Sequence, residues 1–200
     1  MNANPHDAYA ADYDQQVEAY GSHVTDVLFG LCYEFIEPGQ RLLDAGIGTG
    51  LSAQLFARAG LAIYGMDFSP AMLALCCDKG LAVYLQQHDI RQQPWPYPVG
   101  AFDHLVCCGV LHFVADLQAI FAEARRVLAK GGLFAFSTRV PTTLTADRSG
   151  YERHTTGGFE IFSHRPAYLE GLLARYCFAP CKSQKCFVGD DLFLAWVVAA

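Results

Sequence analysis

Short apolar runs and amphipathic stretches alternate along most of this chain. Continuous apolar runs of strand length occur at residues 41–44, 62–67, 82–86, 102–108 and 133–137. Apolar residues at helical spacing predict helices at residues 12–35, 51–59, 69–80, 117–128 and 166–173. Because strands that alternate with helices build parallel sheets covered on both faces, the pattern predicts a doubly wound α/β fold.

The last part of the chain departs from this alternation. Two further strands, at 182–188 and 192–198, are separated by only three residues, which is too short for a parallel crossover and predicts an antiparallel pair. Residues 93–100 contain three prolines and are expected to form a loop. Residues 138–165 are rich in Thr, Gly, Arg and His. Their apolar residues follow neither the helical nor the strand period, so this stretch is expected to be irregular.

The sharpest local signal is the stretch 42–50, in which an apolar run ends at Asp44 and is followed by Gly46, Gly48 and Gly50. This order predicts a buried strand, a tight turn and the start of a helix. Glycines let a ligand approach the backbone closely, and open α/β sheets bind ligands in the crevice at the carboxyl ends of their strands. The turn is therefore the predicted ligand site.

Residues near this turn indicate a nucleoside ligand. Asp67 ends the second strand, where its carboxylate could accept hydrogen bonds from both ribose hydroxyls, while Ser69 and Pro70 begin the next helix. Asp89 follows the third strand and could reach the edge of an adenine ring. The residues that could sandwich that ring, and that could equally be ordinary core, are Phe68, Met72 and Ile90.

The spacing of the glycines separates two classes of ligand. A dinucleotide-binding turn has the pattern G-x-G-x-x-G, which would place a glycine where this chain has Leu51. A nicotinamide-dependent oxidoreductase is therefore the less favoured alternative.

Composition bounds the class of protein. The 200 residues suit one domain, 1–200, with 52% hydrophobic and 17% charged residues as in compact globular chains. The net charge of −6, without a block of basic residues, disfavours nucleic acid as a partner. Residues 1–7 lack the features of a signal peptide, and no apolar run reaches the about 20 residues that cross a bilayer, so we expect a cytoplasmic protein that does not span a membrane.

The eight cysteines contain no C-x-x-C pair and match no common zinc-binding pattern. We therefore expect no metal, and reduced, mostly buried thiols that behave as small apolar residues.

Taken together, several segments resemble the motifs of class I S-adenosylmethionine-dependent methyltransferases. Motifs I to IV are matched, in that order, by residues 42–50, 65–73, 88–90 and 102–106. The stretch after motif IV is matched by residues 110–113, and the "LKPGG" before strand five by residues 128–133. The resemblance runs in order from about residue 9 to the end of the sequence. It implies a seven-stranded, mostly parallel, Rossmann-like sheet of order 3-2-1-4-5-7-6, with strand 7 antiparallel.

The resemblance also implies S-adenosylmethionine as cofactor and S-adenosylhomocysteine as its product. The residues expected to bind the cofactor are Tyr13, Asp44, Gly46, Gly48, Gly50, Asp67, Phe68, Met72, Asp89, Ile90 and Cys108. This chain departs from the family pattern at three places. Ile47 replaces a frequent cysteine, Phe113 replaces a histidine after strand four, and Cys107-Cys108 stands where many members have a small or amide residue.

Two segments are expected to cover the site. Residues 1–38 form the predicted amino-terminal lid, because residues 9–14 resemble the "YAPDYD" of members whose first helix covers the cofactor, and Tyr13 would close over its methionine part. Inserts after strand five commonly shape the acceptor pocket in this family, so 139–165 is the expected acceptor insert. Its cationic character suggests an anionic acceptor, bound by residues drawn from Arg139, Arg148, Tyr151, Arg153, His154, His164 and Arg165.

Methyl transfer is a direct displacement at an activated methyl group, so the protein mainly aligns the nucleophile and excludes water. A base is needed only where the nucleophile must lose a proton, and His112 is the candidate, although a structural histidine is an equally good interpretation. We predict a methyltransferase that acts on an O, N, S or C nucleophile of a small-molecule acceptor, as a monomer or homodimer. The alternative is a non-catalytic module that binds the cofactor or its product and serves a partner.

Overall fold

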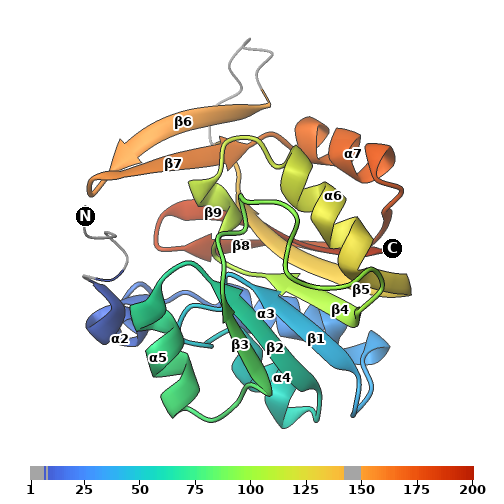
Figure 1. Ribbon diagram of the computed structural model, residues 1–200. Coiled ribbons are helices and arrows are strands. Elements are labelled where there is room, and N and C mark those ends of the chain that lie inside the picture. Colours follow the sequence, from blue (N-terminus) through green and yellow to red (C-terminus); the bar gives the residue numbers. More distant parts are fainter. Residues whose placement is uncertain (1–6, 8, 142–149) are drawn as a thin grey trace.

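A computed structural model describes residues 7, 9–141 and 150–200 as one mixed sheet with helices on both faces (Figure 1). Five parallel strands lie side by side in the order β3 (Tyr84–Gln87), β2 (Ala62–Asp67), β1 (Arg41–Ala45), β4 (Phe102–Cys107) and β5 (Leu128–Arg139). The sheet continues through two antiparallel strands, β9 (Asp191–Ala199) beside β5 and β8 (Ala179–Val188) beside β9. The predicted order 3-2-1-4-5-7-6 is confirmed, with β9 in the place of strand 7 and β8 in that of strand 6.

Both faces of the sheet are buried because neighbouring residues of a strand point to opposite sides. Leu42 belongs to one hydrophobic cluster and Leu43 to the other, and Ala135 and Phe134 repeat this division in β5. Double burial explains why these strands are continuous apolar runs in the sequence. The covering helices are α3 (Val24–Cys32), α4 (Ala53–Arg58) and α5 (Pro70–Asp78) on one face, and α6 (Gln118–Val127) and α7 (Pro166–Arg175) on the other.

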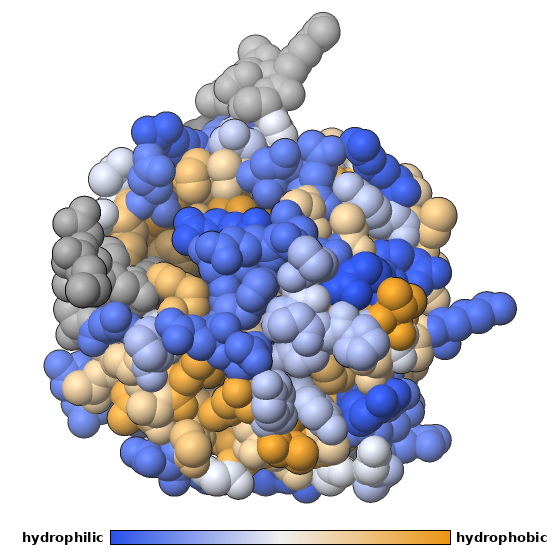
Figure 2. Space-filling view, viewed as in Figure 1, coloured by the Kyte–Doolittle hydropathy of each residue, from blue (hydrophilic) through white to orange (hydrophobic). Residues whose placement is uncertain are grey.

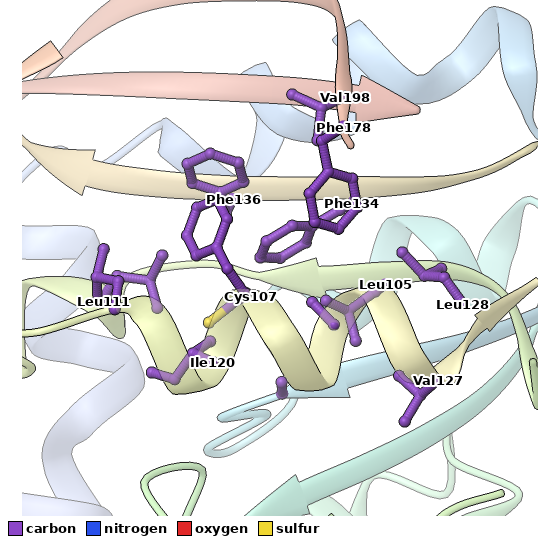
Figure 3. Packing of buried hydrophobic residues seen from close by; sticks show 14 of the residues in the cluster. Leu105, Cys107, Leu111, Ile120, Val127, Leu128, Phe134, Phe136, Phe178 and Val198 are labelled. Atoms are coloured by element: carbon purple, nitrogen blue, oxygen red, sulfur yellow. The ribbon is translucent and has the colours of Figure 1, made fainter. Parts of the chain in front are cut away.

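The cluster under α6 and α7 is rich in aromatic rings (Figure 3). Phe134 and Phe136 of β5 lie with their ring centroids 4.7 Å apart, and Phe121 of α6 meets both edge-on at 5.4 and 5.3 Å. Phe178, just after α7, packs on Phe134 at 5.7 Å. This packing joins β5 to both helices of that face, so it supports the strand whose carboxyl end faces the ligand site.

The helix predicted at 12–35 is two helices in the structure, so that prediction is wrong. α2 (Tyr13–Ala19) ends before Gly21, whose φ of +59° is a left-handed conformation that stops a helix. α3 then starts in a new direction and packs against β8 and β9. Short 3-10 helices extend the two at Ala10–Asp12 and Tyr33–Phe35.

Part of the stretch expected to be irregular is a β-hairpin, which corrects a second prediction. β6 (Tyr151–Thr156) and β7 (Phe159–His164) pair antiparallel across Gly157 and Gly158, which have φ of +59° and +82°. Two consecutive residues with positive φ are what a two-residue hairpin turn needs, and a Gly-Gly pair between two runs is its sequence signal. That signal is present in this sequence and identifies the hairpin.

The start of β5 also differs from its prediction. The strand begins at Leu128 and not at residue 133, so Gly131 and Gly132 lie inside it. The register with β4 shifts near this point, as at a β-bulge. A Cβ on Gly132 would lie 2.5 Å from the carbonyl oxygen of Asp103, so glycine is required by the close approach of the two strands.

The eight cysteines are all unpaired thiols, as expected. They are not mostly buried, however. Cys32, Cys76 and Cys107 are buried, two others are intermediate and three are exposed. Within the described ranges, no helix has the length and apolar character needed to cross a membrane.

Candidate functional site

A cavity of about 740 Å³ opens at the carboxyl ends of β1, β2 and β4. Nine of the eleven residues predicted to bind a cofactor line it, and they are Tyr13, Gly46, Gly48, Asp67, Phe68, Met72, Asp89, Ile90 and Cys108. Asp44 and Gly50 are not among the lining residues. The cavity continues past the turn to His112, Phe113 and Arg139, so the predicted cofactor and acceptor regions share one space.

The three glycines of the turn have different roles, although all three have positive φ values. A Cβ on Gly48 would meet no atom within 4 Å, so this glycine presents bare backbone to the cavity. A Cβ on Gly46 would lie 2.5 Å from Val110, and one on Gly50 would lie 3.0 Å from the Cys76 sulfur. Gly46 and Gly50 are therefore required by packing around the turn, and Gly48 by access to the cavity.

The carboxylate of Asp67 is positioned by backbone groups on both sides. One oxygen accepts a hydrogen bond from the Gly48 N–H at 2.9 Å, and the other accepts one from the Ser69 N–H at 2.9 Å. Ser69 also caps α5, because its hydroxyl accepts a hydrogen bond from the Met72 N–H at 3.2 Å. The predicted roles of Ser69 and Pro70 at the start of α5 are confirmed, and the backbone N–H of Ser69 fixes one oxygen of Asp67.

Asp44 lies behind the turn in a closed environment. Its side chain is fully buried, and one carboxylate oxygen accepts a hydrogen bond from the Ser52 hydroxyl at 2.5 Å, while the other has no hydrogen-bond partner among the described residues. Burial, partly offset by this hydrogen bond and reinforced by the nearby Asp67, raises the pKa of Asp44 to about 7. Asp44 therefore supports the turn from beneath and does not face the cavity.

Asp89, which follows β3 beside the end of β2, is bound by Arg91. The guanidinium donates from Nε and Nη2 to the two carboxylate oxygens at 2.9 and 2.7 Å. Burial by itself would raise the pKa of Asp89, but the hydrogen bonds and charge of Arg91 lower it, so the side chain stays ionised. Sequence reasoning named Asp89 and missed its partner two residues later.

The loop after Asp89 is held by a buried network that the sequence did not reveal. The indole N–H of Trp95 donates to the Ile90 carbonyl at 3.0 Å, and the Trp95 N–H donates to Glu123 at 2.6 Å. Arg126 binds Glu123 and also donates to the Trp95 and Tyr97 carbonyls. The predicted proline-rich loop is thus fixed on α6, which places Ile90 against the cavity.

The amino-terminal helix α2 covers the glycine turn. Tyr13 lines the cavity, and the next residue, Asp14, accepts hydrogen bonds from the Thr49 hydroxyl and from Lys79 Nζ, both at 2.5 Å. Asp7 accepts a hydrogen bond from the Ser69 hydroxyl. Burial, together with nearby acidic groups, raises the pKa of Tyr13 to about 12, so its phenol keeps its proton.

The remaining part of the cavity is mainly apolar. The His112 ring lies 4.1 Å from the Phe113 ring and meets Phe193 edge-on at 5.4 Å, measured between centroids. Arg139 enters the same region from the end of β5 and forms an ion pair with Asp191 of β9. Figure 2 shows hydrophobic residues on the corresponding side of the molecule, between the β6–β7 hairpin and α5.

Most of the residues expected to bind the acceptor do not line this cavity. Arg153 pairs with Glu160 across the hairpin at 2.6 Å, Arg165 pairs with Glu152 at 2.8 Å, and His154 lies 3.9 Å from Glu152.

His164 is fully buried, and its Nε2 lies 3.0 Å from the Val114 carbonyl oxygen, which attaches the hairpin to the loop after His112. Of that group, Arg139 lines the cavity, and Arg148 lies outside the described residues.

Comparison with known proteins shows that this chain is similar to methyltransferases. Residues 43–136 match the family model described as a methyltransferase domain. Among curated proteins, the malonyl-[acyl-carrier protein] O-methyltransferase of Serratia marcescens is 36% identical over 101 residues, which are 50% of this chain and 39% of that protein. A demethylmenaquinone methyltransferase of Tropheryma whipplei is 32% identical over 97 residues, 48% of this chain and 41% of that protein. The chain thus spans less than half the length of these relatives.

Solved structures share the fold at low identity. An S-adenosylmethionine-dependent methyltransferase from Mesorhizobium loti superposes with a TM-score of 0.72 at 20% identity, over 86% of this chain and 96% of that one. The magnesium protoporphyrin IX methyltransferase of Synechocystis, solved with S-adenosylhomocysteine bound, gives 0.71 at 18% identity, over 92% and 85%.

Proposed function

We propose that this chain is a class I S-adenosylmethionine-dependent methyltransferase that transfers a methyl group to an O, N, S or C nucleophile of a small-molecule acceptor, and the match of residues 43–136 to the methyltransferase-domain model, the curated relatives and the shared fold support this proposal. The observation that carries the proposal is the single cavity that joins the glycine turn and Asp67 to His112 and Arg139. A cofactor lying on the turn and an acceptor lying beside His112 would meet inside it. Substrates named for the relatives include carrier-bound malonyl groups and quinone precursors, which differ widely, so they support the reaction class more than a particular acceptor.

The residues around the turn fit S-adenosylmethionine. The open side of Gly48 leaves room for a ligand where a Cβ would stand, and both Asp67 oxygens are held by backbone N–H groups. A carboxylate oxygen can accept a second hydrogen bond, so this orientation allows Asp67 to bind ribose hydroxyls as well. Ionised Asp89 lies at the same end, beside Ile90, for the adenine ring.

When bound, the cofactor supplies a sulfonium-activated methyl group. The protein's own part is to bind, orient and exclude water. α2 covers the turn and Tyr13 closes one side of the cavity, while Phe113 and Phe193 form the wall next to His112. Where the acceptor nucleophile must lose a proton, the imidazole of His112 is the group placed to accept it.

Calorimetric titration with S-adenosylmethionine, S-adenosylhomocysteine and NAD tests the cofactor. We expect one-site micromolar binding of the first two and none of NAD. Asp67→Ala should weaken that binding at least tenfold, because it removes the charged acceptor at the end of β2. The control is Glu170→Gln, an exposed acid on α7. Binding of NAD alone, or equal affinities in Asp67→Ala and the unmodified protein, would contradict the assignment.

A turnover assay then separates the enzyme from a non-catalytic binding module. Purified protein is incubated with radiolabelled S-adenosylmethionine and a panel of phenols, amines, thiols and carboxylic acids, alone and with a cell extract of small molecules. Label transfer to an extract component supports the enzyme. Tight cofactor binding without transfer in either arm supports the binding module.

The proposed setting is the cytoplasm, with a small molecule as the partner and the protein as a monomer or homodimer. We propose that nucleic acid is not a partner, and the net charge of −6 supports this.

A further inference from the structure

The acceptor end of the cavity carries an ion pair between two strands. Arg139 ends β5 and pairs in register with Phe193 of β9, while the next residue along, Val140, donates its N–H to the Leu192 carbonyl at 2.9 Å. Side chains alternate along a strand, so Asp191 and Phe193 face the same side as each other. Both line the cavity, and the Arg139 guanidinium reaches the Asp191 carboxylate there.

Among the described residues that line the cavity, acidic side chains outnumber arginines and lysines. Its arginines are Arg91, paired with Asp89, and Arg139, paired with Asp191. The acids that line it are Asp67, Asp89, Asp190 and Asp191. Asp190 lies in the β8–β9 turn and is followed by Asp191, the first residue of β9, so the described lining of the acceptor end carries one arginine and two carboxylates.

The walls beside the ion pair are apolar. Phe113 and Phe193 flank the His112 ring, and Val114, Ile161 and Val188 complete this part of the lining. An anion bound here would lose water without gaining an unengaged cation among the described lining residues, and burial of a charge without a partner is strongly unfavourable.

We propose that Asp191 determines the charge of the acceptor: by holding Arg139 in an ion pair, it makes the site select an uncharged, largely apolar molecule and reject a carboxylate. This inference rests on the proposed methyl-transfer function and narrows its substrate class. It also reverses the interpretation that the Arg- and His-rich stretch binds an anionic acceptor, because Arg153 and Arg165 are paired with glutamates away from the cavity.

Asp191 is the better residue to change because the two partners differ in exposure. The Arg139 side chain is 19% exposed and that of Asp191 is 46% exposed. Asp191→Asn therefore leaves a largely covered guanidinium in the cavity with its neutralising charge removed. A carboxylate ligand could then take the place of Asp191, with the bidentate geometry that arginine favours. The variant would lose the Asp191 carboxylate, which repels an acid, and would free the Arg139 guanidinium, which attracts one, so the charge specificity for the acceptor would change.

The test uses matched probes that differ only in charge: 4-hydroxybenzoate and its methyl ester, indole-3-acetate and its methyl ester, and decanoate and its methyl ester. Dissociation constants are measured calorimetrically on the full chain, with and without saturating S-adenosylhomocysteine. For the unmodified protein we expect at least one ester to bind at least tenfold more tightly than its acid. In Asp191→Asn the ester-to-acid preference should fall at least tenfold, and Asp191→Ser should repeat this.

Glu160→Gln is the matched control, because it breaks the Arg153–Glu160 pair outside the cavity and should leave the preference unchanged. Thermal unfolding and S-adenosylhomocysteine affinity check that each variant is folded. A preference of the unmodified protein for the acids, no binding of any ester, or an unchanged preference in both Asp191 variants would overturn the inference. Failure to bind S-adenosylhomocysteine while the ester preference holds would count against the proposed function instead.

Discussion

Asp44 and Asp67 end neighbouring strands of the sheet, yet their carboxylates lie in different environments. Asp67 lines the cavity and accepts hydrogen bonds from two backbone N–H groups. Asp44 is enclosed behind the turn, with the Ser52 hydroxyl as its donor. At the scale of the residue, Asp67 is therefore placed to face a ligand. Asp44 affects stability instead, because a buried carboxyl prefers its neutral form.

Asp44→Asn should raise the free energy of unfolding of the ligand-free protein above pH 7. The pKa of Asp44 is raised to about 7 in the folded state, so the unfolded chain loses this proton first, and the folded state becomes less stable as pH rises from about 4 to 7. Asparagine carries no charge and can still accept the Ser52 hydrogen bond. The stability difference between variant and parent should grow over that range to at most about 4 kcal/mol.

Urea unfolding at half-unit pH steps from 4 to 8 measures this difference, and taking it between two proteins cancels the titration of groups they share. Asp26→Asn, an exposed acid on α3, is the control and should not show the rise. A difference that stays constant with pH would contradict the assignment of a raised pKa to Asp44.

At the scale of the element, α2 and the β6–β7 hairpin close the cavity from segments far apart in the sequence. Tyr9, just before α2, packs on Phe159 at the start of β7 with ring centroids 5.8 Å apart, and Phe159 lies 6.0 Å from Phe113. Both elements therefore meet over the acceptor end, and the bonds of Asp14 hold α2 to the turn.

Asp14→Asn should weaken binding of S-adenosylhomocysteine about two- to fivefold. Asp14 joins α2 to Thr49 and to Lys79, and the pair with Lys79 is partly exposed, so each interaction contributes modestly. Hydrogen exchange of the α2 amides should become faster in the same variant. Glu18→Gln, an exposed acid on the same helix, is the control. Equal affinities in the two variants would show that the lid does not contribute to binding through Asp14.

At the scale of the molecule, two hydrophobic clusters on opposite faces of the sheet position the strand ends that build the cavity. The cluster that contains Phe134, Phe121 and Phe178 fixes β5 between β4 and β9. Loss of this packing acts on the whole fold, because β5 pairs with both neighbours and its carboxyl end carries Arg139.

Phe134→Ala should lower the free energy of unfolding by about 3–5 kcal/mol, the usual cost of removing a buried aromatic ring from a packed core. Phe134 is fully buried and contacts three other rings. Phe187→Ala removes the same side chain type from a 62% exposed position on β8 and should change stability by less than about 0.5 kcal/mol. Similar urea midpoints for the two variants would show that this cluster does not stabilise the fold.

The order of elements and the glycine turn follow from local rules, and for that reason they were predictable. The continuous apolar runs, the Ser69-Pro70 start of α5 and the short β8–β9 connection each depend on residues close in sequence. Two of the errors arose where glycines overrode the pattern. Gly21 breaks the first helix, and Gly157-Gly158 turns a stretch without clear periodicity into a hairpin.

The amino-acid sequence by itself determined the alternation of strands and helices, the glycine turn and the set of polar residues that follow the strands, because period, spacing and turn chemistry are local properties. The order of the strands was implied by the resemblance to the methyltransferase family. Only the tertiary structure decided which charges face the cavity. Arg139 meets Asp191, whereas Arg153 and Arg165 turn to glutamates of the hairpin. Such pairings join residues brought together by strand register and not by sequence distance, so a cationic stretch in the sequence becomes a largely neutralised one in the fold.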